Sequence, residues 1–134
     1  VESRGRRMAK QIKGFVRNLL PHVMLELRTG ERTTRVPMIV DTGNDHSEIV
    51  VGRGVANFLD AEILAEPIEA KMASGKWDLM DACVIEYIWF GEWQKTVAPI
   101  CDELIGLLGV PLLENCKLEV NFAEPQSVAI TLSE

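Results

Sequence analysis

The sequence predicts a mostly β fold, a small barrel or sandwich that carries one or two short helices. Short runs of β-branched, aromatic and other apolar residues recur from residue 19 onward. Gly, Asn, Asp and Ser separate many of these runs, as in hairpin turns. Only residues 55–59 and the stretch after Gly109 show a helical pattern. Many short strands joined by tight turns are typical of a barrel or sandwich.

In the first half of the chain, the pattern predicts a hairpin followed by a short strand and a helix. The expected strands are 22–28, 33–40 and 48–51, and the expected helix is 55–59. Thr29-Gly30-Glu31 is the predicted hairpin turn. Pro37 indicates an edge strand or a bulge, because proline cannot donate a ladder hydrogen bond. Val55, Phe58 and Leu59 share one face of the helix.

In the second half, the pattern predicts two more hairpins and two C-terminal strands. The expected strands are 66–72, 76–80, 83–90, 93–97, 118–122 and 127–132. Ser74-Gly75 and Gly91-Glu92 are the predicted hairpin turns. Residues 104–113 are apolar almost throughout. A helix is expected after Gly109, because Pro111 suits a first helical turn.

Length and composition indicate one globular domain. The chain has 134 residues and a mass of 15.0 kDa, with 47% apolar and 25% charged residues. It contains no run of about 18 apolar residues, so no membrane span is expected. The net charge is −6 overall, but it is +5 over residues 1–20 and therefore −11 over the rest. An acidic body argues against nucleic-acid binding, which needs clustered Lys and Arg.

The basic N-terminal segment, residues 1–18, is expected to be a flexible arm ahead of a domain over residues 19–134. The first 20 residues lack the apolar stretch of a secretory signal, since their longest apolar clusters are Phe15-Val16 and Leu19-Leu20. Its Arg-rich, acid-poor composition leaves a transit peptide open. The arm could also bind an acidic partner, which would make the protein a regulatory or assembly subunit.

Cysteine usage indicates a reducing compartment. Cys83, Cys101 and Cys116 form no CxxC pair and are odd in number. A disulfide framework is therefore not expected, and the cytoplasm is the predicted location.

No metal or cofactor is expected. His22 and His46 are far apart and lack a supporting cysteine pair, unlike the ligands of a zinc site. The acidic residues around His46 resemble a calcium loop, but Gly43 stands at the second ligand position and His46 at the required glycine. Gly52-Arg53-Gly54 lacks the third glycine of a dinucleotide-binding loop.

The strongest functional signal is Val40-Asp41-Thr42-Gly43, where an apolar strand runs directly into a carboxylate. The strand would carry this carboxyl group into a desolvated centre. The Thr42 hydroxyl can hydrogen-bond the backbone, and Gly43 allows close backbone approach and leaves an N–H for the carboxylate. Asp and Gly are also ordinary turn residues, so the motif on its own fits a simple turn as well.

With its surroundings, the motif resembles that of the retropepsin-like (clan AA) aspartic peptidases, and the resemblance runs from about Leu19 to Phe122. Residues 23–59 are similar to the family's hairpin, catalytic triplet, short strand and helix. Residues 72–77 look like a flap hairpin tipped by small residues. Residues 107–122 look like the family's apolar pair, glycine, helix and alternating strand. The resemblance implies a closed barrel of the double-psi type with a flap hairpin.

The resemblance also implies the roles of individual residues. Asp41 would be catalytic, and Thr42, Gly43 and Gly109 would support it, with Gly109 packed behind the catalytic loop. A peptide would lie extended beneath the flap and hydrogen-bond as an added strand. The flap residues expected to bind it are Ala73, Ser74, Gly75 and Trp77.

The chemistry predicts a dimer. The sequence has one Asp-Thr-Gly triplet, whereas the reaction needs one ionised carboxylate to activate water and one protonated carboxyl group to polarise the scissile carbonyl. Two such groups about 3 Å apart share a single proton. The second Asp41 must therefore come from another copy of the chain, and we expect a two-fold homodimer with the site on its axis. Water would attack directly, without a metal or a covalent intermediate.

The residues after the triplet, Asn44-Asp45-His46, depart from the family pattern, in which Ala or Ser commonly comes next. The departure bears on the expected substrate contacts and on the working pH rather than on Asp41 itself. His46 is expected to be a solvated loop residue or to tune the pH response of the site. Ser74 has no base nearby in the sequence, so a turn role is expected for it rather than nucleophilic catalysis.

The leading functional prediction is an aspartic endopeptidase that hydrolyses peptide bonds in extended polypeptides. The alternative is a catalytically weak or inactive dimer of the same fold that binds peptides or has a regulatory role.

Overall fold

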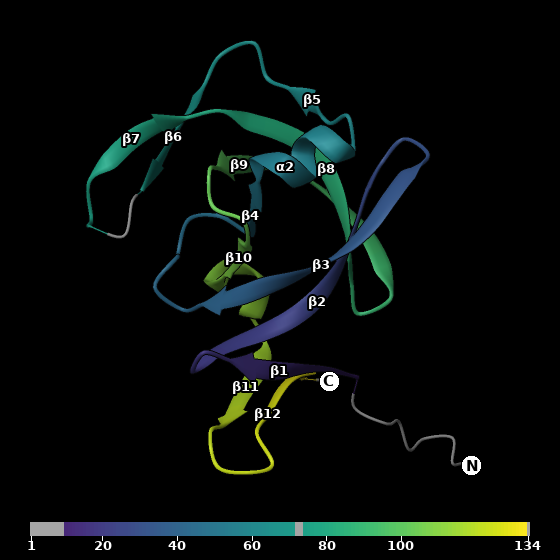
Figure 1. Cartoon of the computed structure of the whole chain (residues 1–134), viewed down its shortest axis with the longest axis vertical. Coiled ribbons are helices and arrows are strands. Elements are labelled where there is room, and N and C mark those ends of the chain that lie inside the picture. Colours follow the sequence, from purple (N-terminus) through teal and green to yellow (C-terminus); the bar gives the residue numbers. More distant parts are fainter. Residues whose placement is uncertain (1–9, 72–73, 134) are drawn as a thin grey trace.

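The computed structural model describes residues 10–71 and 74–133, which form a mostly β fold around a closed six-stranded barrel (Figure 1). The prediction of a mostly β barrel is thereby confirmed. The strands are β1 (Gln11–Arg17), β2 (Leu20–Thr29), β3 (Arg32–Asp41), β4 (Ile49–Gly52), β5 (Glu62–Ile63), β6 (Ile68–Lys71), β7 (Trp77–Met80), β8 (Ala82–Trp89), β9 (Glu92–Cys101), β10 (Gly106–Gly109), β11 (Cys116–Asn121) and β12 (Ser127–Leu132). The helical segments are α2 (Arg53–Phe58) and the 3₁₀ turn η1 (Val110–Leu113).

The barrel closes because β2 pairs with β8 as well as with β3. The large sheet has the order β11-β12-β1-β2-β3-β10-β4-β9-β8-β5, and the additional β2–β8 pairing joins two distant strands of this order. Leu27 on β2 lies opposite Tyr87 on β8 at this closure. The strands β2, β3, β10, β4, β9 and β8 therefore form a ring, and a ring leaves fewer open strand edges than a flat sheet.

Strand β10 lies between two strands that are neighbours in sequence. It runs parallel to β3, with Gly109 opposite Asp41, and antiparallel to β4, with Leu107 opposite Val50. The loop that connects β3 to β4 must therefore pass over the end of β10. This crossing places residues 42–48 directly against the residues that follow β10.

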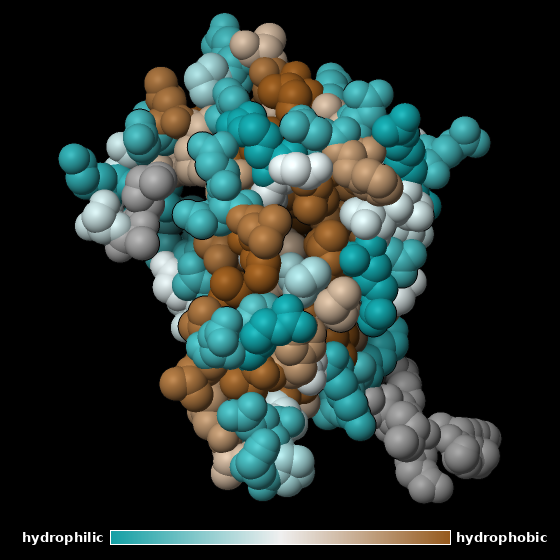
Figure 2. Space-filling model, viewed as in Figure 1, coloured by the Kyte–Doolittle hydropathy of each residue, from teal (hydrophilic) through white to brown (hydrophobic). Residues whose placement is uncertain are grey.

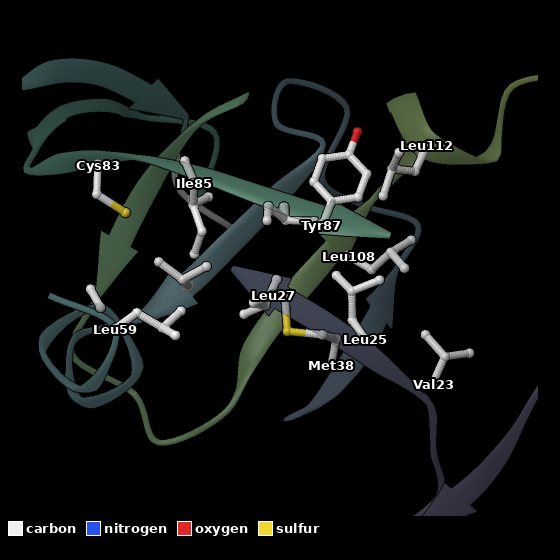
Figure 3. Close-up of a cluster of buried hydrophobic side chains, with 14 of the residues drawn as sticks. Val23, Leu25, Leu27, Met38, Leu59, Cys83, Ile85, Tyr87, Leu108 and Leu112 are labelled. Atoms are coloured by element: carbon white, nitrogen blue, oxygen red, sulfur yellow. The ribbon is translucent and has the colours of Figure 1, made fainter. Parts of the chain in front are cut away.

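The core fills the barrel with apolar side chains from the ring strands. Val23, Leu25 and Leu27 point inward from β2, and Leu108 points inward from β10 (Figure 3). Each is at most 2% exposed. Tyr87 joins this cluster through its ring, and Figure 3 shows its hydroxyl pointing away from Leu25 and Leu27. Burial of about ten such side chains at roughly 1.5–3 kcal/mol each is the main stabilising contribution here.

The expectation of a flexible arm over residues 1–18 is wrong for residues 11–17, which form strand β1. This strand pairs with β12 through Gln11–Gly14 and with β2 through Phe15–Arg17. Ile12 and Val16 pack against the core, and the Phe15 ring stacks on His22 with centroids 5.1 Å apart. The alternation of apolar and polar residues in β1 was hard to recognise in the sequence, because the charges of Lys13 and Arg17 dominate the local composition. Residues 1–9 lie outside the described residues.

Most of the predicted hairpins form at the predicted turns. The β2–β3 turn contains Gly30 at φ +56°, and the β8–β9 turn contains Gly91 at φ +84°. Pro37 is on a strand with partners on both sides, but β10 begins its pairing only at Met38. The missing N–H of Pro37 therefore faces the side where no ladder has yet begun.

The apolar stretch 104–113 contains a strand that was not predicted, and both helix predictions need correction. Residues Gly106–Gly109 form strand β10, which glycine at both ends and the absence of alternation hid. The helix expected after Gly109 is only the four-residue turn η1, with Pro111 in its first turn as predicted. The helix expected at 55–59 begins two residues earlier and ends at Phe58.

On the face shown in Figure 2, hydrophilic side chains surround apolar side chains that gather near the middle. Within residues 10–71 and 74–133, no helix has the length and apolar character needed to cross a membrane. The three cysteines are all free, and Cys83 is buried.

Candidate active site

Asp41 is the last residue of β3, where the strand leaves the core. Val40 immediately before it is buried, whereas the side chain of Asp41 is half-buried. The backbone N–H of Gly43 donates to Asp41 Oδ1 at 3.0 Å. A hydrogen bond of this kind fixes the orientation of the carboxyl group. The strand therefore delivers one anchored carboxylate to the edge of the core, and not into the desolvated centre that was expected.

The loop that follows is tied by backbone hydrogen bonds to the last residue of β10 and to the residue after it. Val110 N–H donates to the carbonyl of Asn44 at 2.7 Å, and Gly109 N–H donates to the carbonyl of Glu48 at 2.9 Å. These bonds hold both ends of the loop against β10. The Asp41 loop is thus part of the barrel wall rather than a free turn.

Asn44, which departs from the family pattern, organises the middle of this loop. Its side-chain Oδ1 accepts hydrogen bonds from the N–H groups of His46 and Ser47, both at 3.2 Å. Asn commonly stabilises turns in this way, by bonding backbone groups two and three residues ahead. Sequence reasoning noted the residue but not this role, although its place right after a turn is a usable signal.

Gly109 packs against the back of the loop with no room for a side chain. A Cβ atom at this position would lie 2.0 Å from the carbonyl oxygen of Ser47 and 3.0 Å from that of Asn44. Since both neighbours are backbone atoms, they cannot move aside without moving the loop. This close approach is the arrangement that the resemblance implied for the glycine.

A partly buried hydrogen bond from Tyr87 holds the far end of the loop, and no pattern in the sequence predicted it. The Tyr87 hydroxyl donates to Glu48 Oε1 at 3.0 Å, although the two residues are 39 positions apart. Burial, together with the hydrogen bond and charge of Glu48, raises the pKa of Tyr87 well above its ordinary value. The hydroxyl therefore stays protonated and keeps donating to the carboxylate at neutral pH.

A cavity of about 550 Å³ lies between this loop and the β6–β7 hairpin. Asp41 and Gly43 line one side of it, and Ser74 and Gly75 line the hairpin side. The remaining wall comes from the barrel and includes Val50, Pro99 and Leu107. The structure thus brings Asp41 together with two of the four predicted flap residues over one cavity. A space of this size and composition is typical of a binding site.

The hairpin residues differ in what they contribute. Gly75 has φ +88°, a conformation that favours glycine, and Ser74 Oγ accepts a 3.4 Å hydrogen bond from Lys76 N–H, which fits a turn role. Trp77 is 53% exposed, and its ring lies 4.7 Å from that of His46 on the Asp41 loop. Ala73 lies outside the described residues.

Some residues singled out in the sequence lie apart from the cavity. Thr42 is exposed and does not line the cavity. Trp93 lies under Arg28, whose guanidinium carbon is 3.8 Å from the ring centroid, and Trp89 packs against Phe90. Among residues 10–71 and 74–133, no group of three or more His, Cys, Asp and Glu side chains could hold a metal ion.

Comparisons of the chain with protein-family models, with curated proteins and with solved structures found no match.

Proposed function

We propose that this chain is an aspartic endopeptidase that acts as a two-fold homodimer. The observation that supports it most directly is the setting of Asp41. Its carboxylate is held by the Gly43 N–H at a strand end and opens into a cavity covered by a hairpin. A single anchored carboxylate beside a cavity of this size would supply half of a paired-aspartate arrangement.

The second half would come from another copy of the chain. Peptide hydrolysis by this mechanism needs a carboxylate that takes a proton from water and a carboxyl group that donates to the scissile carbonyl oxygen. A two-fold axis beside Asp41 would place two identical carboxyl groups together, and like charges at close range force them to share one proton. The two Asp41 carboxyl groups have the same sequence around them, so they would differ in role only because one of them carries the shared proton.

The proposed substrate is an extended polypeptide segment. The cavity has apolar walls from Val50, Met80 and Leu107, and the β6–β7 hairpin forms its own two-stranded sheet. A peptide strand added beside such a hairpin gains backbone hydrogen bonds with little dependence on its sequence. Apolar side chains of the substrate on either side of the scissile bond would pack against these walls.

The first test is Asp41→Asn, with Asp60→Asn as the matched control. Asn keeps the acceptor for Gly43 N–H but cannot ionise, so cleavage of an unfolded protein substrate should fall at least about 1000-fold while the fold is retained. Asp60 has φ +52°, a conformation that Asn tolerates well, and its variant should cleave normally. Full activity in Asp41→Asn would overturn the proposal.

A second test addresses the shared site. Wild-type chains are unfolded and refolded with an equal amount of Asp41→Asn chains, and activity is compared with that of wild type alone at the same total concentration. If each site needs two Asp41 residues, only the pure wild-type dimers cleave, and activity should be about one quarter. About one half would mean that each chain works alone.

The peptide-binding alternative has its own signature. A dimer that binds a statine-type transition-state mimic but cleaves nothing between roughly pH 3 and pH 8 would be a binding protein and not a peptidase. Binding is measured by calorimetry, so this outcome does not depend on cleavage.

A further inference from the structure

The Asp41 loop and the β6–β7 hairpin touch through a pair of aromatic rings. The His46 and Trp77 ring centroids are 4.7 Å apart, with the planes tilted by 59°. Strands β6 and β7 pair only with each other in the sheet arrangement, whereas the loop is tied to the ten-stranded sheet. The contact between the rings therefore links the hairpin side of the cavity to the Asp41 side within one protomer.

His46 is held in place for this contact from two directions. Its backbone N–H donates to Asn44 Oδ1 at 3.2 Å, and its Nε2 lies 2.9 Å from Asp45 Oδ1. The His46 side chain is 37% exposed, so protons from solvent reach it. The ring is thus oriented by its neighbours and still free to change its charge.

Charge on this ring would strengthen both of its contacts. Histidine is the side chain that ordinarily gains a proton between about pH 5 and pH 8. An imidazolium is attracted to the face of tryptophan and to the Asp45 carboxylate. The other titratable groups on the same cavity are the carboxyl groups of Asp41 and Glu103, the Lys71 ammonium group and the Cys101 thiol.

We propose that His46 is a positioning residue that holds β7 over the Asp41 cavity through Trp77, and that it holds more tightly as the pH falls. The cavity of about 550 Å³ is present while the two rings are in contact. The contact between the two rings therefore leaves room for a bound molecule in the cavity. The effect on catalysis rests on the proposed function, but the contact and its pH dependence do not.

The direct test is tryptophan emission of the substrate-free protein as a function of pH. Protonated imidazole quenches a neighbouring indole, so wild-type emission should fall as the pH is lowered from about 8 to about 5. The change should be lost in both His46→Gln and Trp77→Phe and retained in Trp89→Phe, the matched control. An undiminished change in His46→Gln or in Trp77→Phe would overturn the contact.

A second measurement asks whether the contact holds the hairpin. Amide hydrogen exchange of residues 77–80 is compared between wild type and His46→Gln at the same pH. At about pH 5.5 exchange should be roughly two- to fivefold faster in the variant, and at about pH 8 the difference should shrink, since only the charged ring has the cation–π contribution. Equal exchange at both pH values would mean that the rings touch without holding β7, which would overturn the proposal.

Kinetics then separate this proposal from the proposed function. If the protein cleaves peptides, His46→Gln should raise KM about two- to fivefold at about pH 5.5, leave kcat unchanged and converge with wild type at higher pH. A fall in kcat with KM unchanged would contradict a positioning role. If wild type cleaves nothing while emission and exchange behave as expected, the proposed function fails and the contact stands.

Discussion

The Asp41 loop and the β6–β7 hairpin line the same cavity but are held in opposite ways. The loop leads into β4, whose four residues are all buried, and its ends are bonded to the chain after β10. In the hairpin, Ala70 is the only buried residue of β6 and β7, and both strands pair only with each other. One side of the cavity is part of the barrel, and the other is a cover attached at its base.

This difference suits the proposed function. In a peptidase, the groups that carry out chemistry must be held within a fraction of an ångström, and a loop tied into a barrel wall meets that need. The cover of such a site must open to admit a polypeptide, which a less stable part of the fold can do. Substitutions on the loop side should therefore cost much more stability than substitutions on the hairpin.

The largest effect is expected at Gly109. Gly109→Ala would place a methyl group 2.0 Å from the Ser47 carbonyl oxygen, and the loop must shift to admit it. We expect a loss of about 3 kcal/mol or more in the free energy of unfolding, measured by urea denaturation.

Gly54→Ala is the control for this substitution, because its Cβ would meet nothing within 4 Å. It lies in α2 and should change stability by less than about 1 kcal/mol, in the stabilising direction. If the Gly109→Ala variant were as stable as the Gly54→Ala variant, the Asp41 loop would not be held rigidly against β10.

An intermediate effect is expected at Tyr87. Tyr87→Phe removes the hydrogen bond to Glu48 and should lower stability by about 1–2 kcal/mol at neutral pH. Glu48→Gln keeps an acceptor for the hydroxyl and should cost less. Similar losses in the two variants would show that the hydrogen bond stabilises the fold only when Glu48 is charged.

The pH dependence of the Tyr87→Phe difference has a definite sign. Because the pKa of Tyr87 is raised in the folded protein, its contribution is complete below the unfolded-state pKa of about 10 and is lost as the pH rises further. The stability gap between wild type and Tyr87→Phe should therefore be constant from pH 7 to about pH 9 and should shrink above about pH 10. A gap that widens above this pH would contradict the assignment.

The smallest effect is expected on the hairpin. Leu79 on β7 is 61% exposed, whereas Leu108 on β10 is fully buried. Leu79→Ala should change the free energy of unfolding by no more than about 0.5 kcal/mol, and Leu108→Ala should cost about 2–5 kcal/mol. Thermal unfolding of both variants measures the contrast. A large cost at Leu79 would mean that the hairpin is covered in the native assembly.

Much of the local structure was predictable because it depends on neighbours in sequence. Gly30 and Gly91 mark their turns because each adopts a positive φ. The alternation of Leu118–Phe122 predicted β11, although this strand ends at Asn121. The Asp41 motif predicted a carboxylate at a strand end with a hydrogen bond from Gly43 N–H.

The missed features depend on residues far apart in sequence. β1 is a strand because β2 and β12 flank it, and its own composition looks like that of a basic arm. Tyr87 reaches Glu48 only because closure of the barrel brings β8 beside the Asp41 loop. Trp77 meets His46 only because the hairpin folds over the same cavity. No local pattern carries this information.

The sequence by itself determined where the strands turn, which residue ends β3 with a carboxylate, and that one chain carries one such triplet. Backbone conformation and side-chain chemistry of adjacent residues are enough for those features. Only the tertiary structure decided that β10 enters between β3 and β4 and that Gly109 comes to lie behind the loop. The physical reason is that strand pairing is settled by closing the whole barrel, where every backbone group must find a partner at once.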